Sequence, residues 1–435
     1  MGSKLTQSEL KVLFLTREYP PDIYGGAGVH VDYLSRELAK LIPVEVRTFG
    51  TQDIRSGNPI VRGHRFAQGE AGDAPAQFLM ALQAIRVSAS FAARPIDADL
   101  VHCHTWYAHF GGLLVKILYG IPLVVTAHSL EPLRPWKREQ LGRGADLAAW
   151  IERTVIQAAD GVVAVSQEMK ADILHHFGIA QDRVHVIWNG IDTDEYRPVS
   201  ASQRLDRHGI KADRPYVLFV GRISRQKGIL HLVNAIPHLD PAAQVVLCAA
   251  SPDSADIARE VEEAVGRVAA VPDRVIWIRE MVDRPTAIEL YSHAAVFCCP
   301  SIYEPFGIIN LEAMACEIPV VASAVGGIKE VVVHGETGYL VPVEQHPDRP
   351  FEVVNPDRFS ADLALHINRL LADAPLRRAM GAKGRRRAEA LFSWHAVARH
   401  TLSLYESLVR PGARTSAAPD PRVPEFPWTP KGDLP

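Results

Sequence analysis

The chain has 435 residues, more than a single hydrophobic core usually accommodates, so the sequence predicts two domains. Charged residues make up 22% and the formal net charge is −3, a balance that excludes proteins built to bind nucleic acids or acidic membrane surfaces. Five cysteines without a CxxC spacing, and the lack of any apolar run of membrane-spanning length, predict a reduced cytoplasmic protein with no stable membrane association.

The first half of the chain alternates short apolar runs with helical patterns. The runs are residues 12–15, 44–46, 100–101, 123–125 and 162–165. Because each run is apolar throughout, without alternating polar residues, it predicts a strand covered on both faces, as in a parallel sheet. We therefore expect residues 10–205 to form a Rossmann-like domain, with ligands bound at the carboxyl ends of its strands.

A glycine-containing loop follows the first of these strands. Gly25 and Gly26 lie just before a helix that is expected to begin near Val29. Paired glycines let the backbone approach a bulky ligand, and the start of the helix offers N–H groups to an anion. The dinucleotide fingerprint G-x-G-x-x-G is absent, and the second strand does not end in an acidic residue. The segment is therefore either a ligand-binding loop or a long glycine turn.

Histidines occur on the next two strands. His102 and His104 lie on one strand, and His128 comes just after the following strand. We interpret His102 and His104 as core or loop residues and reject a metal site, because no third ligand follows them at helical spacing. Two Asp-x-Asp pairs, interpreted as turn and cap residues, lie where loops are expected: Asp97/Asp99 and Asp192/Asp194. The sequence therefore predicts no metal ion.

The alternation begins again after a polar stretch that ends at residues 214–215. Its apolar runs are residues 217–220, 245–247, 275–278, 295–297 and 320–322. They predict a second Rossmann-like domain over residues 213–391. A helical run follows at residues 392–410 and is expected to return to the first domain. The proline-rich residues 411–435 predict an extended tail without a core of its own.

Two cations flank the loop after the first strand of this second series. Arg222 lies at the carboxyl end of the strand, and Lys227 lies at the start of the next helix. They can converge on one phosphate group, because arginine offers a fork of donors and lysine a point charge. The alternative is two solvated surface cations, which is the usual fate of arginine and lysine.

The most informative segment follows the fourth apolar run of the second series. Glu304 lies in a loop that contains Gly307, and the spacing becomes helical from Phe306 onward. This places Glu312 about two turns into a helix. The N–H groups near Gly307 and Ile308 then lie between two carboxylates, at the positive end of the helix. A sugar joined to a nucleotide diphosphate presents the matching order of hydroxyls, phosphates and hydroxyls.

Taken together, these residues resemble the retaining GT-B glycosyltransferases of the family-four branch. The resemblance covers about residues 11–410 and rests on Gly25-Gly26, His128, Gly221-Arg222 with Lys227, and Glu304 with Glu312. Within that branch, residues 16–30 and 128–137 are similar to the actinobacterial-type glycogen synthases. Tyr24 departs from the other bacterial glycogen-synthase family, which has a lysine just before its paired glycines.

The resemblance implies a GT-B fold, in which two doubly wound Rossmann-like domains face each other across a cleft. It implies transfer of glucose from ADP-glucose to α-glucan through an α-1,4 link, or to glucose 1-phosphate to give maltose 1-phosphate, with no further cofactor. By resemblance, attack occurs on the face of the sugar that the phosphate leaves, since no carboxylate stands out as the nucleophile of a double displacement. A homodimer is left open.

The resemblance also implies a role for each site residue. The residues expected to be catalytic are Glu304 at the transferred sugar, His128 facing it from the first domain, and Arg222 and Lys227 at the diphosphate. The residues expected to bind the donor are Gly25, Gly26, Met281, Gly307, Ile308 and Glu312, with Met281 beside the base and Glu312 at the ribose hydroxyls. The segment after His128 is expected to border the acceptor through Arg134, Trp136 and Lys137.

Three other functions stay open. The first is a family-four transferase with another sugar donor or acceptor. The second is a nucleotide-sugar epimerase of the same fold, and the third is a glucan-binding protein without activity. The retained carboxylates and cations argue against the third, because sugar binding alone does not require them.

Overall fold

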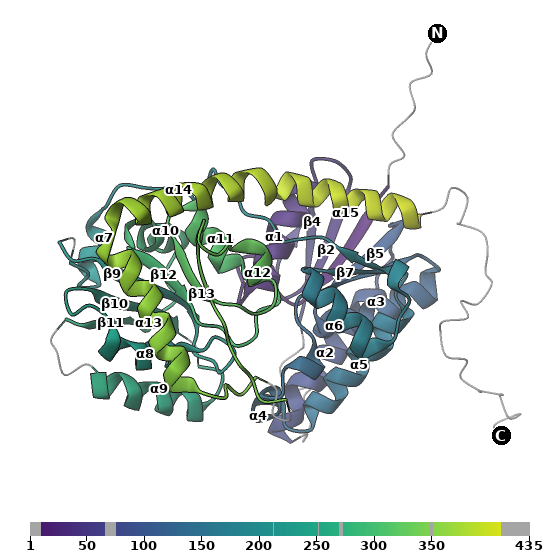
Figure 1. Ribbon diagram of the computed structural model, residues 1–435. Helices are drawn as coiled ribbons and strands as arrows, with labels where there is room; N and C mark the ends of the chain where they lie inside the picture. Colours follow the sequence, from purple (N-terminus) through teal and green to yellow (C-terminus); the bar gives the residue numbers. More distant parts are fainter. Residues whose placement is uncertain are drawn as a thin grey trace, which may run out of the picture.

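The computed structural model describes residues 10–65, 75–211, 213–250, 252–268, 273–347 and 351–409, which form two α/β domains side by side (Figure 1). The tail expected at residues 411–435 lies outside the described residues. Among the described residues, the helices are too short or too polar to cross a membrane.

The first domain is built on an eight-stranded sheet in the order β3-β4-β2-β1-β5-β6-β7-β8. The strands are β1 (Val12–Thr16), β2 (Val44–Phe49), β3 (Asp53–Ile54), β4 (Ile60–His64), β5 (Leu100–His104), β6 (Leu123–Ala127), β7 (Gly161–Ala164) and β8 (Val184–Val186). All neighbours pair in parallel except β3 with β4. Every residue of β1, β5 and β6 is buried, which explains why their sequences are mostly apolar; the polar residues among them, such as His102 and His104 of β5, are buried as well.

The helices of the first domain are α1 (Gly26–Leu38), α2 (Ala76–Ala92), α3 (Trp106–Tyr119), α4 (Lys137–Leu141), α5 (Gly144–Ala158) and α6 (Gln167–Phe177). Local sequence fixes the ends of α6, because the Ser166 hydroxyl accepts the N–H of Met169 and Gly178 closes the helix in the left-handed conformation. Helix α1 begins at Gly26, three residues before the predicted Val29, with Gly25 as its N-cap.

The second domain is built on a six-stranded parallel sheet in the order β11-β10-β9-β12-β13-β14. The strands are β9 (Tyr216–Arg222), β10 (Gln244–Ala250), β11 (Val275–Ile278), β12 (Val296–Cys299), β13 (Val320–Ser323) and β14 (Gly338–Val341). The helices are α7 (Gln203–Arg207), α8 (Ile229–Ala235), α9 (Ala255–Val268), α10 (Arg284–His293), α11 (Ile308–Ala315), α12 (Ile328–Val331), α13 (Pro356–Ala372) and α14 (Ala374–Leu391). The predicted fold class, two doubly wound domains, is confirmed.

Four short strands were not predicted from sequence: β3, β4, β8 and β14. They lie at or next to the edges of their sheets, where a strand is covered less completely and does not need a long apolar run. In β4, for example, Arg62 and Gly63 interrupt the apolar pattern, and only Val61 and His64 are buried.

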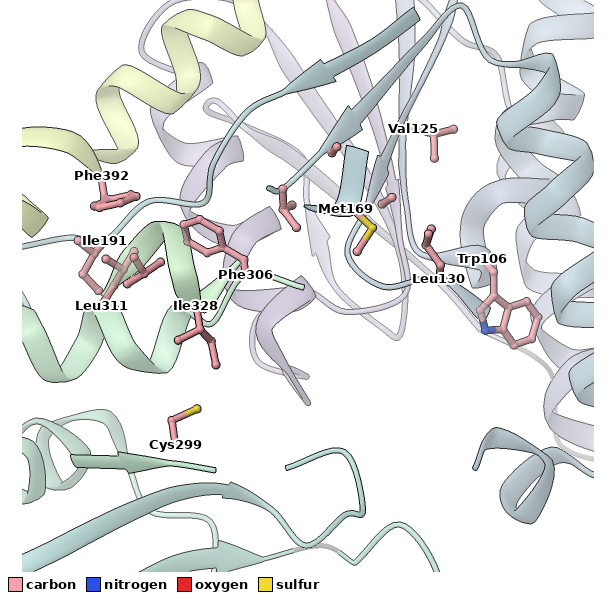
Figure 2. Packing of buried hydrophobic residues seen from close by; sticks show 14 of the residues in the cluster. Trp106, Val125, Leu130, Met169, Ile191, Cys299, Phe306, Leu311, Ile328 and Phe392 are labelled. Carbon is pink, nitrogen blue, oxygen red and sulfur yellow. The ribbon is translucent and has the colours of Figure 1, made fainter. Parts of the chain in front are cut away.

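The chain crosses between the domains at two adjacent points. The N–H of Ile191 donates to the carbonyl of Phe392 at 2.7 Å, so the outgoing and returning segments lie side by side. Figure 2 shows Ile191, Phe306, Leu311 and Phe392 grouped in one apolar cluster at this crossing. Beyond it, α15 (Trp394–Leu408) continues from the end of α14 and packs against α1 of the first domain (Figure 1).

Candidate active site

The residues that carry the sequence motifs meet at the carboxyl ends of the strands. Among the parallel strands of each sheet the order reverses once, between β1 and β5 and between β9 and β12. Ligands of doubly wound folds bind in the crevice outside such a reversal. Arg222 is the last residue of β9, and Glu304 follows the end of β12. The topology therefore brings the predicted phosphate and sugar ligands to one crevice in the second domain.

Lys227 and Glu304 form an ion pair at the centre of this crevice. The Lys227 Nζ lies 2.6 Å from the Glu304 Oε2, and the Ser301 hydroxyl donates to the same oxygen at 3.1 Å. Both side chains are largely buried, with 16% and 9% of their surfaces exposed. A cation suited to phosphate and a carboxylate suited to hydroxyls therefore touch directly, which matches the junction between a diphosphate and a sugar.

Arg222 is held by a partner that the sequence did not single out. Its guanidinium pairs with Asp253, a buried carboxylate in the loop after β10. The same guanidinium lies 5.2 Å from the centre of the Tyr24 ring, which comes from the glycine loop of the first domain. Asp253 could have been found by the rule that identified Arg222, because β9 and β10 are neighbours, Arg222 ends β9 and Asp253 follows the end of β10.

The glycine loop and the start of α11 face each other across the crevice. A Cβ atom added at Gly26 would lie 3.6 Å from the Ile308 side chain. The Glu18 carboxylate accepts the N–H groups of Tyr24 and Gly25, at 2.8 Å each, and so holds the loop in place. Gly307 has a φ of +97°, a conformation that suits glycine and lets the chain turn into α11. Both predicted donor loops therefore border the same crevice.

Glu312 lies closer to the start of its helix than predicted. Helix α11 begins at Ile308, so Glu312 is just over one turn into it, because Gly307 delays the helical start expected at Phe306. The Tyr291 hydroxyl donates to the Glu312 Oε2 at 2.8 Å. Burial raises the pKa of Glu312, although hydrogen bonds from Tyr291 and Tyr196 oppose that shift.

Unlike Glu312, Met281 is exposed to solvent. It follows β11, and 70% of its surface is exposed. Its neighbour Arg279 turns away, with its guanidinium 3.9 Å from the centre of the Trp277 ring and 2.7 Å from the Glu262 carboxylate. A contact between Met281 and a nucleotide base therefore stays a prediction.

His128 lies at the carboxyl end of β6, within a cluster of histidines. The His128 Nε2 lies 3.1 Å from the His104 Nδ1, and the His30 ring lies 4.7 Å from the His128 ring. Burial, together with the neighbouring histidines, lowers the pKa of His128 and His104 well below the usual range. Both rings are therefore neutral at pH 7. His102 is a core residue, as predicted, bonded to Tyr405 at 2.6 Å.

The sequence argument considered only ligands that follow His102 and His104 along the chain, and it did not consider His30, which comes from an earlier helix. The ring nitrogens of His30, His104 and His128 lie within 4.8 Å of one another, because α1 brings His30 beside β5 and β6. The His30 Nδ1 is occupied by the Asn189 side chain at 2.7 Å, and the His104 Nδ1 and the His128 Nε2 pair with each other at 3.1 Å. We therefore interpret the group as a hydrogen-bonded cluster that orients His128.

The segment after His128 reaches the second domain. The Trp136 ring is buried and lies 5.5 Å from the Phe351 ring and 6.2 Å from that of Tyr303, the residue before Glu304. Lys137 is also buried, and Arg222 is among the charges that affect its pKa. Arg138, by contrast, is an exposed cation paired with Asp146. Two of the three predicted acceptor residues, Trp136 and Lys137, therefore contact or face the second domain.

Arg134, the third predicted acceptor residue, makes its side-chain contacts within the segment that follows His128. Its guanidinium contacts the Ser129 hydroxyl at 3.2 Å and the Glu131 carboxylate at 3.3 Å. These contacts hold the segment in a compact turn beside His128.

Two family models and several known proteins match the chain over most of its length. Residues 24–195 match the family model Glycosyltransferase Family 4, and residues 202–387 match the model Glycosyl transferases group 1. The alpha-maltose-1-phosphate synthase of Mycolicibacterium smegmatis is 44% identical over 407 residues, covering 92% of this chain and 100% of that protein. The D-inositol 3-phosphate glycosyltransferase of Xylanimonas cellulosilytica is 32% identical over 403 residues, covering 88% and 91%.

A solved structure shows the same arrangement of domains. Sucrose-phosphate synthase from Thermosynechococcus elongatus superimposes with a TM-score of 0.73 at 26% identity, covering 92% of this chain and 99% of that one. The resemblance stated from the motifs is confirmed. The chain therefore belongs to the GT-B glycosyltransferases that join a Glycosyltransferase Family 4 domain to a Glycosyl transferases group 1 domain, and the protein is an enzyme of that class.

Proposed function

We propose that the enzyme transfers glucose from ADP-glucose, with retention of configuration, to glucose 1-phosphate or to the end of an α-glucan. The observation that carries the proposal is the buried Lys227–Glu304 pair beside the start of α11. The similarity to alpha-maltose-1-phosphate synthase supports glucose as the transferred sugar and glucose 1-phosphate as an acceptor.

The donor is expected to exchange the present ion pairs for its own contacts. Lys227 and Arg222 turn to the diphosphate and stabilise the charge that develops as it leaves. Glu304 accepts hydrogen bonds from hydroxyls of the transferred sugar, and Glu312 accepts those of the ribose. The acceptor itself is expected to attack on the face of the sugar that the phosphate leaves, as the resemblance to the family-four transferases implies. The leaving phosphate then takes the proton of the acceptor.

The cations near Trp136 favour a phosphorylated acceptor. Burial, and then the nearby Arg134 guanidinium, lower the pKa of Lys137 to about 7, while Glu131 and Asp253 act in the opposite direction. Arg222 also lowers it. The carboxylates of Glu131 and Asp253 already offset part of the positive charge there, and the three cations can together bind a further anion. The phosphate of glucose 1-phosphate would supply that anion, while Trp136 packs against a sugar ring.

The KM for glucose 1-phosphate is expected to rise with pH. Lys137 is a cation below its pKa of about 7 and neutral above it, so it can bind phosphate only on the acid side. Each pH unit above 7 should therefore raise the KM for glucose 1-phosphate by up to about tenfold. Initial rates between pH 6.5 and 8.5 measure this dependence. Lys137→Arg should flatten it, because a guanidinium stays charged throughout this range.

A neutral acceptor provides the control for this profile. The KM for maltotriose should change little over the same range, since its binding needs no cation. An equal slope for both acceptors, or the same slope in the parent and in Lys137→Arg, would contradict a phosphate contact at Lys137.

A panel of donors and acceptors tests the proposed function. ADP-, UDP- and GDP-glucose are each incubated with glucose 1-phosphate, maltose or maltotetraose, and products are identified by mass and by the anomeric NMR signal. We expect the highest rate with ADP-glucose and glucose 1-phosphate, and an α-linked product. Because Arg222 and Lys227 neutralise the diphosphate, rates should be unchanged in chelator. Loss of activity in chelator that magnesium or manganese restores would contradict this point.

The same panel separates the alternatives. An epimerase would change the donor sugar without adding it to an acceptor. With inositol 3-phosphate added to the acceptors, transfer to it but not to glucose 1-phosphate would favour another family-four activity, such as that named for the Xylanimonas cellulosilytica relative. Donor binding without nucleotide release would point to a glucan-binding protein.

A further inference from the structure

A cavity of about 260 Å³ lies at the outer edge of the first sheet and belongs to the first domain alone. Its lining comes from the turn between β2 and β3, from β3 and β4 themselves, and from the segment that follows α2. Strands β2 and β1 lie between β4 and the strand reversal at β5, and none of the residues assigned to the donor or the acceptor lines the cavity. The volume is below the range of about 300–1,000 Å³ that is usual for drug-sized ligands, so it suits a smaller one.

Four arginines and a single carboxylate line this cavity. The arginines are Arg55 after β3, Arg62 in β4, Arg65 after β4 and Arg94 after α2, and the carboxylate is that of Asp53. A guanidinium binds phosphate oxygens through a planar fork of N–H donors, so a concave surface with several of them favours a phosphate group.

Protein carboxylates neutralise these cations only in part. Asp53 lies 2.6 Å from Arg55 and forms an ion pair with it. The Glu45 Oε1 lies 2.9 Å from the Arg47 Nε and 3.1 Å from the Arg62 Nε, so one carboxylate serves two guanidiniums. The buried Arg62 Nε has no hydrogen-bond partner among the described residues, so its contact with Glu45 is an ion pair without a hydrogen bond.

The other two arginines of the lining are not neutralised by a carboxylate. Within the part of the chain that the structure describes, Arg65 and Arg94 form no ion pair. Burial, and then three nearby guanidiniums, lower the pKa of His64 to about 4. These guanidiniums belong to Arg47, Arg94 and Arg62, so their charges converge on one place. An exposed arginine usually meets only water, but several guanidiniums around a hollow focus a positive potential that attracts an anion.

One residue of the lining connects the cavity with the glycine loop. The Gln52 Nε2 donates to the carbonyls of Tyr19 at 3.2 Å and Pro20 at 3.4 Å. It also lies 3.2 Å from the Asp22 carboxylate. Two residues further along, Tyr24 reaches the second domain. A ligand that fixes the turn between β2 and β3 therefore also restrains the loop that borders the donor.

We propose that this cavity binds a phosphate group, either as inorganic phosphate or as part of a small phosphate monoester, and that the bound phosphate steadies the glycine loop through Gln52. The site is separate from the crevice in which the sugar is transferred, and the proposal does not depend on which donor or acceptor the enzyme uses. Phosphate bound here acts as an effector, because it restrains a loop of the active site from outside the cleft.

Calorimetric titration with inorganic phosphate, at pH 7 and constant ionic strength and without donor or acceptor, tests the binding. The double substitution Arg62→Gln/Arg94→Gln should weaken one phosphate site by at least about tenfold, because it removes two charge-assisted contacts. Any phosphate held by the active site is the same in the parent and in this variant, which keeps all active-site cations. Arg259→Gln/Arg358→Gln is the matched control, since it removes the same charge from two exposed ion pairs of the second domain.

A second titration, with glycerol 3-phosphate, identifies the form of the ligand. Tighter binding of glycerol 3-phosphate assigns the site to a phosphate monoester, and equal or tighter binding of inorganic phosphate assigns it to the free ion. Equal phosphate binding in the parent and in Arg62→Gln/Arg94→Gln, with unchanged melting temperatures, overturns the site. No sugar is transferred in these titrations, so their outcome is independent of the proposed function.

Hydrogen exchange of the peptide that covers residues 17–28 measures the effect on the glycine loop. Phosphate should slow exchange there in the parent, because restrained backbone opens less often. The slowing should be lost in Gln52→Ala, which keeps the arginines of the cavity, and in Arg62→Gln/Arg94→Gln. Equal slowing in the parent and in both variants, or exchange in the parent that phosphate does not change, overturns the action on the loop.

Discussion

Replacing Lys227 by alanine should lower kcat/KM for the glycosyl donor by at least about 10²-fold, and Arg222→Ala should have an effect of the same order. Each cation is expected to stabilise charge on the leaving diphosphate, and one such donor typically contributes about 2.7–4 kcal/mol to the transition state. Lys227→Ala should be the more damaging change. It also leaves the Glu304 carboxylate, which is largely buried, without its cation 2.6 Å away.

The measurement is a full Michaelis curve for the nucleotide sugar, with circular dichroism to show that each variant is folded. Lys211→Ala is a suitable control, because Lys211 pairs with Asp273 on the exposed surface of the same domain. A surface pair of this kind contributes about 0–1 kcal/mol to stability, so its loss should leave turnover unchanged. Near-normal turnover in folded Lys227→Ala or Arg222→Ala would contradict the claim that the replaced cation binds the leaving diphosphate.

Replacing the two carboxylates by their amides should give opposite kinetic signatures. Glu304→Gln is expected to lower kcat by about 10²-fold, because Glu304 contacts the sugar whose charge changes during the reaction. Glu312→Gln is expected to raise the donor KM by about tenfold with little change in kcat, because the ribose is bound equally in the ground state and the transition state. Both substitutions keep the shape of the side chain, remove its charge and exchange one acceptor oxygen for an NH₂ donor.

Steady-state kinetics with the donor varied at saturating acceptor distinguish the two effects. Glu336→Gln, at an exposed position of the same domain, is the matched control and should behave as the parent. If Glu304→Gln mainly raised KM while Glu312→Gln mainly lowered kcat, the roles of the two carboxylates would have to be exchanged.

Much of the site could be predicted because parallel sheets place their strand ends together. The apolar runs located the central strands, and the residues that follow them included Arg222, Lys227, Glu304 and His128. The same logic failed for β4, where Arg62 and Gly63 interrupt the pattern, and it overlooked Asp253, which follows β10 next to Arg222. Strand β4 lies next to the edge of its sheet and is only partly buried, so it needs no apolar run, and in sequence a carboxylate in a loop resembles any other surface residue.

The sequence by itself determined which segments are buried strands and which polar residues lie at their ends, because hydrophobic periodicity reports the surroundings of each element separately. Only the tertiary structure decided which residues meet across elements and domains. Tyr24 lies against Arg222 from the other domain, His30 joins His104 and His128, and Trp136 meets Phe351. These pairings depend on how α1 packs beside β5 and how the domains close at Ile191 and Phe392, and no local pattern in the chain encodes those distances.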